Sequence, residues 1–190
     1  MNPAPAEPEL QPTGGGGVVW ITGLPSAGKS TLAEALAAAL RRAGRAALVL
    51  DGDRLRAGLS RDLGFAHPAR TEQVRRAAEI ARIAAEQEQI AIAALVSPIR
   101  ADRATARAIA APLPFIEVWL DATPALCRSR DPKGLWADAS AGRRSGLTGH
   151  DAPYEAPERP ELRLDAAAPV AAHAEALLAA LRKAGLIPAA

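Results

Sequence analysis

Short apolar runs alternate along the chain with Ala- and Arg-rich stretches whose apolar positions recur at the period of a helix. The apolar runs predict five strands, the last of them weakly: residues 18–22, 46–50, 90–96, 115–120 and 162–164. The other stretches predict five helices: residues 29–42, 71–88, 102–111, 124–130 and 170–184. Because strands and helices alternate, neighbouring strands need crossover connections. The pattern therefore predicts an α/β fold, with a five-stranded, mostly parallel sheet and helices on both faces.

Two segments interrupt this alternation. Residues 1–17 contain four prolines and end in four consecutive glycines, a composition that buries too little apolar surface to offset the entropy of ordering. Between residues 131 and 160 the periodicity disappears, and such long polar loops inside a domain usually serve as lids or binding loops. We expect a flexible tail over residues 1–17 and one domain over 18–190, with a lid at about 131–150. Trp136, in that lid, is expected to cover a nucleotide or to pack on a partner.

Composition narrows the classes of function. Lys and Arg number 23 against 21 Asp and Glu, a net charge of +2, so we expect no nucleic-acid partner. The single cysteine, Cys127, excludes an internal disulfide, and no apolar run reaches the roughly 18 residues that span a bilayer. The first residues lack the basic flank and apolar stretch of a signal peptide. We therefore expect a cytoplasmic protein with no membrane partner.

Residues 23–30 (GLPSAGKS) match the pattern G-x-x-x-x-G-K-[ST] between a predicted strand and a predicted helix. Backbone N–H groups of such a loop, the helix dipole and the lysine together bind phosphates, and the hydroxyl after the lysine holds Mg²⁺. The motif predicts a bound nucleotide with Mg²⁺, and Ser30 as a magnesium ligand, but it does not separate a small-molecule kinase from a GTPase, an ATPase motor or a nucleotide switch. The residues expected around the nucleotide are Gly23, Pro25, Ser26, Ala27, Gly28, Lys29, Ser30 and Thr31.

Two carboxylates, Asp51 and Asp53, follow the second predicted strand. At the carboxyl edge of a parallel sheet, one carboxylate can orient magnesium waters while the other accepts a proton from a hydroxyl nucleophile. We assign the proton to Asp53 and count Asp51 as a further magnesium candidate. The alternative is a tight turn in which an aspartate caps a short helix beginning near Arg54.

Four arginines either follow a predicted strand end or lie in predicted loops above the sheet, where an anionic substrate would bind: Arg56, Arg70, Arg100 and Arg103. Each arginine taken alone is also compatible with a solvated surface position. As a group, they favour an anionic substrate.

Several ordered blocks give the chain a family resemblance: WITGLPSAGKST at 20–31, LDGDRLRAGLSRDLGF at 50–65, SPIRADR at 97–103, RDPKGLW at 130–136 and TGHDAPYEAPE at 148–158. The chain resembles the adenylylsulfate kinases, P-loop enzymes of sulfate assimilation. These enzymes use ATP to phosphorylate the 3′-hydroxyl of adenosine 5′-phosphosulfate (APS), which gives 3′-phosphoadenosine 5′-phosphosulfate (PAPS). The resemblance implies a P-loop kinase fold, ATP over the phosphate loop, APS beyond Asp53 and a mobile lid.

The resemblance also implies residue roles. Asp53 would lie near the attacking hydroxyl, Lys29 at the phosphates, and Arg130 in the lid would approach the transferring phosphoryl group. Phe65 would stack on the APS adenine. The residues implied in APS binding are Asp53, Arg56, Phe65, Arg70, Gln73, Ser97, Ile99, Arg100, Lys133 and Leu147.

Three departures from the family pattern lie on the APS side. Gln73 stands where the family has Asn, Ile99 where it has an aromatic residue, and Leu147 where it has Phe. They leave open a kinase that acts on another small hydroxyl compound, and a module that binds nucleotide without turnover is a further alternative. A homodimer and an association with a sulfurylase are both compatible with the resemblance.

Overall fold

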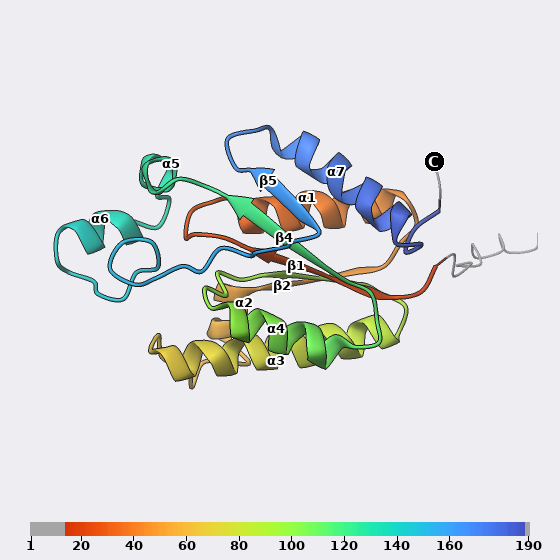
Figure 1. Ribbon diagram of the computed structural model, residues 1–190, viewed down its shortest axis with the longest axis horizontal. Coiled ribbons are helices and arrows are strands. Elements are labelled where there is room, and N and C mark those ends of the chain that lie inside the picture. The colour runs from red at the N-terminus through yellow and green to blue at the C-terminus, as the bar shows by residue number, and fades with distance from the viewer. Residues whose placement is uncertain (1–13, 189–190) are drawn as a thin grey trace, which may run out of the picture.

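The computed structural model describes residues 14–188, in which five parallel strands form one sheet in the order β2-β3-β1-β4-β5 (Figure 1). Every pairing in this sheet is parallel. The strands are β1 (Gly17–Thr22), β2 (Ala47–Asp51), β3 (Ile90–Ala94), β4 (Phe115–Asp121) and β5 (Leu162–Asp165). The central strand β1 is buried along its whole length, as expected of a strand covered on both faces. The predicted α/β class and parallel sheet are confirmed.

The helices form a layer on each face of the sheet (Figure 1). They are α1 (Lys29–Arg42), α2 (Gly52–Ala57), α3 (His67–Glu86), α4 (Arg100–Ala110), α5 (Pro124–Arg130), α6 (Leu135–Ser140) and α7 (Val170–Lys183). Helices α1 and α7 pack on one face, and their leucines join Ile21 and Ile92 in one core cluster. On the other face α3 and α4 bring mainly alanines against Trp20. Small side chains here allow the helices to approach the sheet closely.

Helix α6 lies in the segment whose sequence shows no helical period. The Oδ2 atom of Asp131 accepts hydrogen bonds from the backbone N–H groups of Trp136 and Ala137, both at 3.0 Å, and so satisfies the start of the helix. The Trp136 side chain is 1% exposed and belongs to the larger core cluster. Trp136 therefore packs inside its own chain, which corrects the expectation that it would cover a nucleotide or meet a partner.

The first strand begins one residue earlier than the sequence predicts, because Gly17 already belongs to β1. A Cβ atom on Gly16 would lie 1.8 Å from the carbonyl oxygen of Ala85, so only glycine fits against the end of α3. The buried Arg45 donates from Nη2 to the carbonyl oxygen of Gly15 at 2.8 Å. Residues 14–17 are thus packed, while the rest of the predicted tail, residues 1–13, lies outside the described residues.

All strands point the same way, so the loops that follow them meet at one edge of the sheet. The connection after β1 runs toward β2 on one side of the sheet, whereas the connection after its neighbour β4 runs to β5 on the other side. The segment that carries α5 and α6 extends beyond the same edge (Figure 1). Within residues 14–188, no helix combines the length and the apolar character needed to cross a membrane.

Candidate active site

A cavity of about 560 Å³ opens at the carboxyl edge of the sheet. Its walls come from the loop after β1, the end of β2, the connection from α2 to α3, and the segment that carries α6. Most residues singled out from the sequence line it: Pro25, Ser26, Ala27, Gly28, Lys29, Ser30, Thr31, Asp51, Asp53, Arg56, Phe65, Arg70, Gln73, Ser97, Arg130, Lys133 and Leu147.

The loop between β1 and α1 depends on two glycines with positive φ. Gly23 has φ +153°, and a Cβ atom there would lie 2.6 Å from the carbonyl oxygen of Leu120; Gly28 has φ +107°. The loop curls around Lys29, whose Nζ donates to the carbonyl oxygens of Gly23 at 3.0 Å and Leu24 at 2.7 Å. Burial lowers the pKa of Lys29 to about 8. A buried ammonium group is thus held at the centre of an anion-binding loop.

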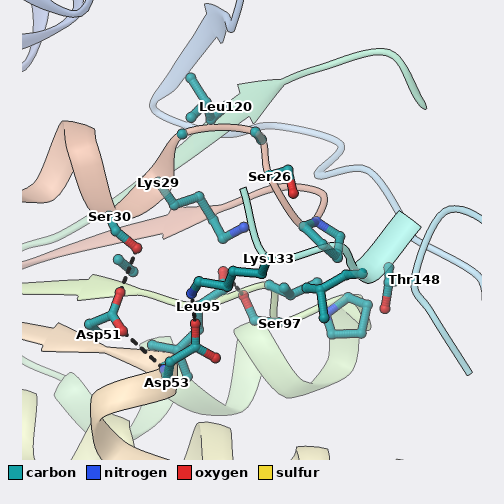
Figure 2. Close-up of a pocket in the computed structure, with 18 of the residues that line it drawn as sticks. Ser26, Lys29, Ser30, Asp51, Asp53, Leu95, Ser97, Leu120, Lys133 and Thr148 are labelled. Carbon is teal, nitrogen blue, oxygen red and sulfur yellow. Dashed lines mark hydrogen bonds and ion pairs between the residues drawn. The ribbon is translucent and has the colours of Figure 1, made fainter. Parts of the chain in front are cut away.

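Ser30 and Asp51 bring two oxygen atoms together beside this loop. The Ser30 hydroxyl donates to Oδ2 of Asp51 at 2.5 Å (Figure 2). Oδ1 of Asp51 accepts from the backbone N–H groups of Asp53 at 3.0 Å and Arg54 at 3.2 Å, so Asp51 caps α2. Burial raises the pKa of Asp51, but these hydrogen bonds outweigh it and leave the pKa below its usual value. A hydroxyl and an ionised carboxylate are ligands that Mg²⁺ prefers.

Asp53 points into the cavity from the first turn of α2 and forms an ion pair with Lys133 (Figure 2). The hydrogen bond to Asp53 raises the pKa of Lys133, so the lysine carries its charge. Since Asp51 caps α2, the Asp53 carboxylate is not needed to cap this helix. The capping alternative therefore applies to one of the two aspartates and leaves the other available for chemistry.

Two arginines border the cavity near α3. Arg56 donates from Nη1 to the carbonyl oxygens of Leu63 and Gly64, and Arg70 donates to Thr148 Oγ1 at 2.7 Å. Within residues 14–188, neither arginine has a carboxylate partner within 4 Å. Burial, and then the charge of a neighbouring arginine, lowers the pKa of each guanidinium. An anion placed here would meet two fixed, uncompensated positive charges.

Phe65 lies beside these arginines with 58% of its surface exposed. The guanidinium carbon of Arg56 lies 4.5 Å from the centre of the Phe65 ring, and that of Arg144 lies 5.7 Å from it. Arg144 also lines the cavity. Sequence reasoning missed Arg144 because it lies in a loop with no periodicity and no recognised motif.

Three residues expected near the substrate do not line the cavity: Ile99, Arg100 and Arg103. The side chain of Arg100 pairs with Glu158 instead. Arg103 is 3% exposed and donates to Glu117 Oε1 and to the carbonyl oxygens of Ser97 and Glu155, each at 2.7 Å. Arg100 and Arg103 therefore fasten the loop after β3 to the chain between α6 and β5.

Arg130 lies at the other end of the cavity. Its Nη1 donates to the carbonyl oxygen of Ala27 at 3.1 Å and its Nη2 to that of Ala166 at 2.9 Å. The guanidinium thus joins the phosphate loop to the turn between β5 and α7, where Val170 and His173 also line the cavity. Arg130 therefore borders the phosphate loop, and its approach to the transferring phosphoryl group stays a prediction.

The side chains lining the cavity carry an excess of positive charge. The cations are Lys29, Arg56, Arg70, Arg130, Lys133 and Arg144, against the carboxylates of Asp51 and Asp53. The Arg56 end follows β2 and the Arg130 end lies beside β5, so the two ends belong to opposite edges of the sheet. A cavity of this charge and extent can hold two anionic ligands end to end.

The profile of the adenylylsulphate kinase family matches residues 15–165. The chain belongs to this family. Adenylyl-sulfate kinase from Aeromonas hydrophila subsp. hydrophila is 48% identical to this kinase over 166 residues, which cover 87% of this chain and 84% of the relative. The bifunctional enzyme NodQ of Azospirillum brasilense is 44% identical over 173 residues, 90% of this chain but 28% of NodQ.

Among solved structures, the Mycobacterium tuberculosis APS kinase CysC in complex with AMPPNP and APS is similar to this kinase with a TM-score of 0.87. The two are 38% identical, and the match covers 89% of this chain and 99% of the other. The resemblance found in the sequence blocks therefore extends to the fold.

Proposed function

We propose that this kinase transfers the γ-phosphoryl group of ATP to the 3′-hydroxyl of APS, giving ADP and PAPS for sulfate assimilation. The observation that carries the proposal is the single cavity with two positive ends and the Lys29, Asp53 and Lys133 side chains between them. The similar CysC structure was determined with an ATP analogue and APS, which supports the same pair of ligands here.

ATP binds at the β5 end in this proposal. The backbone N–H groups of residues 23–31 and the ammonium group of Lys29 hold the phosphates, while Arg130 fixes the wall beside the base. Ser30 and Asp51 provide the oxygen atoms for Mg²⁺. The chemistry that Mg²⁺ supplies when bound is neutralisation of charge on the β- and γ-phosphates.

APS binds at the α3 end in this proposal, with its phosphosulfate against Arg56 and Arg70 and its adenine on Phe65. Asp53 accepts the proton of the 3′-hydroxyl as the 3′ oxygen forms its bond to the γ-phosphorus. The bond from that phosphorus to the bridging oxygen of ADP breaks, so ADP leaves with the bonding electron pair. Lys133 pairs with the Asp53 carboxylate and so orients it in the cavity before the substrate arrives.

Residues 131–150 act as the lid in this proposal. Lys133 contacts Asp53, and Arg70 donates from Nη2 to the carbonyl oxygen of Gly146 at 2.6 Å, so the segment touches both the end of β2 and α3. Closure of this kind excludes water from the phosphoryl group and limits hydrolysis of ATP. Substrate entry then requires these contacts to break.

The test is to incubate the full chain with Mg²⁺, ATP and APS and to separate the nucleotides by ion-pair chromatography. We expect PAPS and ADP in equal amounts, and loss of both in Lys29→Ala. Sugar acids and other nucleosides are offered in parallel as acceptors. Faster ADP formation with one of them would overturn APS as the acceptor, and ATP binding without ADP formation from any acceptor would favour a non-catalytic module.

Homodimerisation, association with a sulfurylase and a cytoplasmic location complete the proposal. The match to 28% of the bifunctional NodQ supports the idea that a kinase of this type works beside a second catalytic unit. Light scattering on the purified chain reports its oligomeric state, and co-purification with a sulfurylase from the same cell tests the association. A monomer that retains no sulfurylase would contradict both partner assignments.

A further inference from the structure

A flat purine ring buried in a cavity needs a surface against each of its two faces. At the α3 end of the cavity, Phe65 is the only aromatic side chain among the described lining residues, because His173 lies at the β5 end. Phe65 is more than half exposed and lines the cavity, so a ligand can reach its ring. One aromatic ring covers one face of a base and leaves the other face without a partner.

Arg144 lies where a second surface is needed. Its guanidinium carbon is 5.7 Å from the centre of the Phe65 ring. Within residues 14–188 it forms no ion pair and donates no hydrogen bond, whereas its neighbour Arg143 pairs with Asp138 at 2.7 Å. The planar guanidinium of Arg144 is therefore uncommitted, unlike those of Arg56 and Arg70, which are tied to backbone carbonyl oxygens.

The spacing suits a base that enters between the two groups. Two stacked contacts of about 3.5 Å require a separation of roughly 7 Å, so the guanidinium has to move outward by only a little more than 1 Å. Gly142 and Gly146 flank this part of the loop with φ values of +71° and +73°, and no atom lies within 4 Å of a Cβ built on either. The loop therefore has glycine at both ends and open space around it.

We propose that Arg144 determines acceptor specificity by stacking its guanidinium on the face of the APS adenine that Phe65 does not cover. The inference rests on the proposed function. Arginine suits this position because its planar, weakly hydrated cation stacks on aromatic rings, which a lysine ammonium does less well. Since the arginine is carried by the lid segment, the base gains this second surface only when that segment lies over the cavity.

The test compares steady-state kinetics of Arg144→Ala, Arg144→Lys and the wild type, with APS and ATP varied separately. Arg143→Ala is the matched control, an adjacent arginine whose partner is Asp138 outside the cavity. We expect Arg144→Ala to raise the KM for APS about 5- to 30-fold, in line with the loss of one stacking surface on a base. Arg144→Lys should lose nearly as much, while the KM for ATP and the Arg143→Ala control stay within about twofold of wild type.

An unchanged KM for APS in Arg144→Ala would overturn the inference. Phosphorylation of APS by the wild type would leave the proposed function standing in that case. Full retention of affinity in Arg144→Lys would also overturn it, because charge rather than stacking would then be the cause. Calorimetric titration of APS into the enzyme with ADP measures binding without turnover. A wild type that neither binds nor phosphorylates APS would remove the proposed function and the inference together.

Discussion

Asp53 is the side chain on which the proposed chemistry depends most directly. Asp53→Asn keeps the shape of the side chain but cannot accept a proton, so we expect the rate of phosphoryl transfer to fall about 10²- to 10⁴-fold. Its Asp51 neighbour still caps α2, so ATP affinity should stay close to wild type. Single-turnover kinetics beside calorimetry of ATP binding checks both parts. Loss of ATP affinity with an unaffected chemical step would move the base to another residue.

Lys29 gives the site a pH dependence whose sign follows from its burial. With a pKa of about 8, free Lys29 is largely deprotonated at pH 8.5, and bound phosphates favour its charged form. Binding of ATP at pH 8.5 should therefore take up about three-quarters of a proton on account of Lys29, and binding at pH 6.5, where Lys29 is already charged, should take up almost none. Calorimetry in buffers of different ionisation enthalpy measures this uptake.

The control for that measurement is Lys29→Met, which has no group to titrate. It should bind ATP more weakly and lose the proton uptake at pH 8.5. If the wild type and this variant take up the same number of protons, the proton goes to another group and Lys29 is charged throughout.

At the scale of elements, one buried arginine connects three parts of the fold. Arg103 in α4 donates hydrogen bonds to Glu117 in β4, to Ser97 in the loop after β3, and to Glu155 in the chain between α6 and β5. Arg103→Met should lower the free energy of unfolding by about 3 kcal/mol, because it leaves the mostly buried Glu117 without its closest charged partner. Denaturant unfolding measures this loss.

The double variant Arg103→Met, Glu117→Gln separates the ion pair from packing. It should recover part of the lost stability, since no unpaired charge stays buried. If the losses of unfolding free energy in the two single variants simply add in the double variant, the Arg103–Glu117 ion pair does not account for them. The hydrogen bonds from Arg103 to the carbonyl oxygens of Ser97 and Glu155 would then be the cause.

Elements with a strong pattern could be predicted from the sequence, and elements fixed by tertiary contacts could not. Both α1 and α5 have the predicted ends, Lys29–Arg42 and Pro124–Arg130. Helix α6 has only six residues, too few for a period, and depends on Asp131 and on the burial of Trp136. Such a helix is visible only once the core into which its tryptophan packs is known.

The candidate active site likewise has parts that could be predicted from the sequence and parts that could not. The phosphate loop and the pair Asp51 and Asp53 are local motifs at a strand end, so their meeting in the cavity follows from the sequence. The direction of a long side chain does not follow from it. Arg100 and Arg103 turn toward glutamates distant in the sequence, while Arg144, in a loop without a motif, lines the cavity.

For the whole molecule, the sheet order separates the two proposed ligands. Phe65 follows β2 at one edge and Arg130 lies beside β5 at the other. Phe65→Ala should therefore raise the KM for APS with little effect on that for ATP, and Arg130→Ala should do the reverse. The double variant should show both changes with additive free energies, because distant sites that share no partner are independent.

Steady-state kinetics with each substrate varied in turn checks this separation. A rise of both constants in either single variant would mean that the two ends are coupled through the lid segment. The conservative variant Phe65→Tyr should keep the wild-type values, since it retains the ring.

The buried indole of Trp136 can report on the site through its intrinsic fluorescence. The Trp136 Nε1 donates to the carbonyl oxygen of Pro25 at 3.2 Å, so a fluorophore of the lid segment is in direct contact with the phosphate loop. Indole emission shifts to longer wavelength when water reaches the ring, whereas Trp20 in the sheet keeps a constant dry environment. Rapid mixing with ATP should therefore give a spectral transient that is absent in Trp136→Phe. Such a transient would time a movement of the segment that carries α6 by light emission alone, with no dye attached.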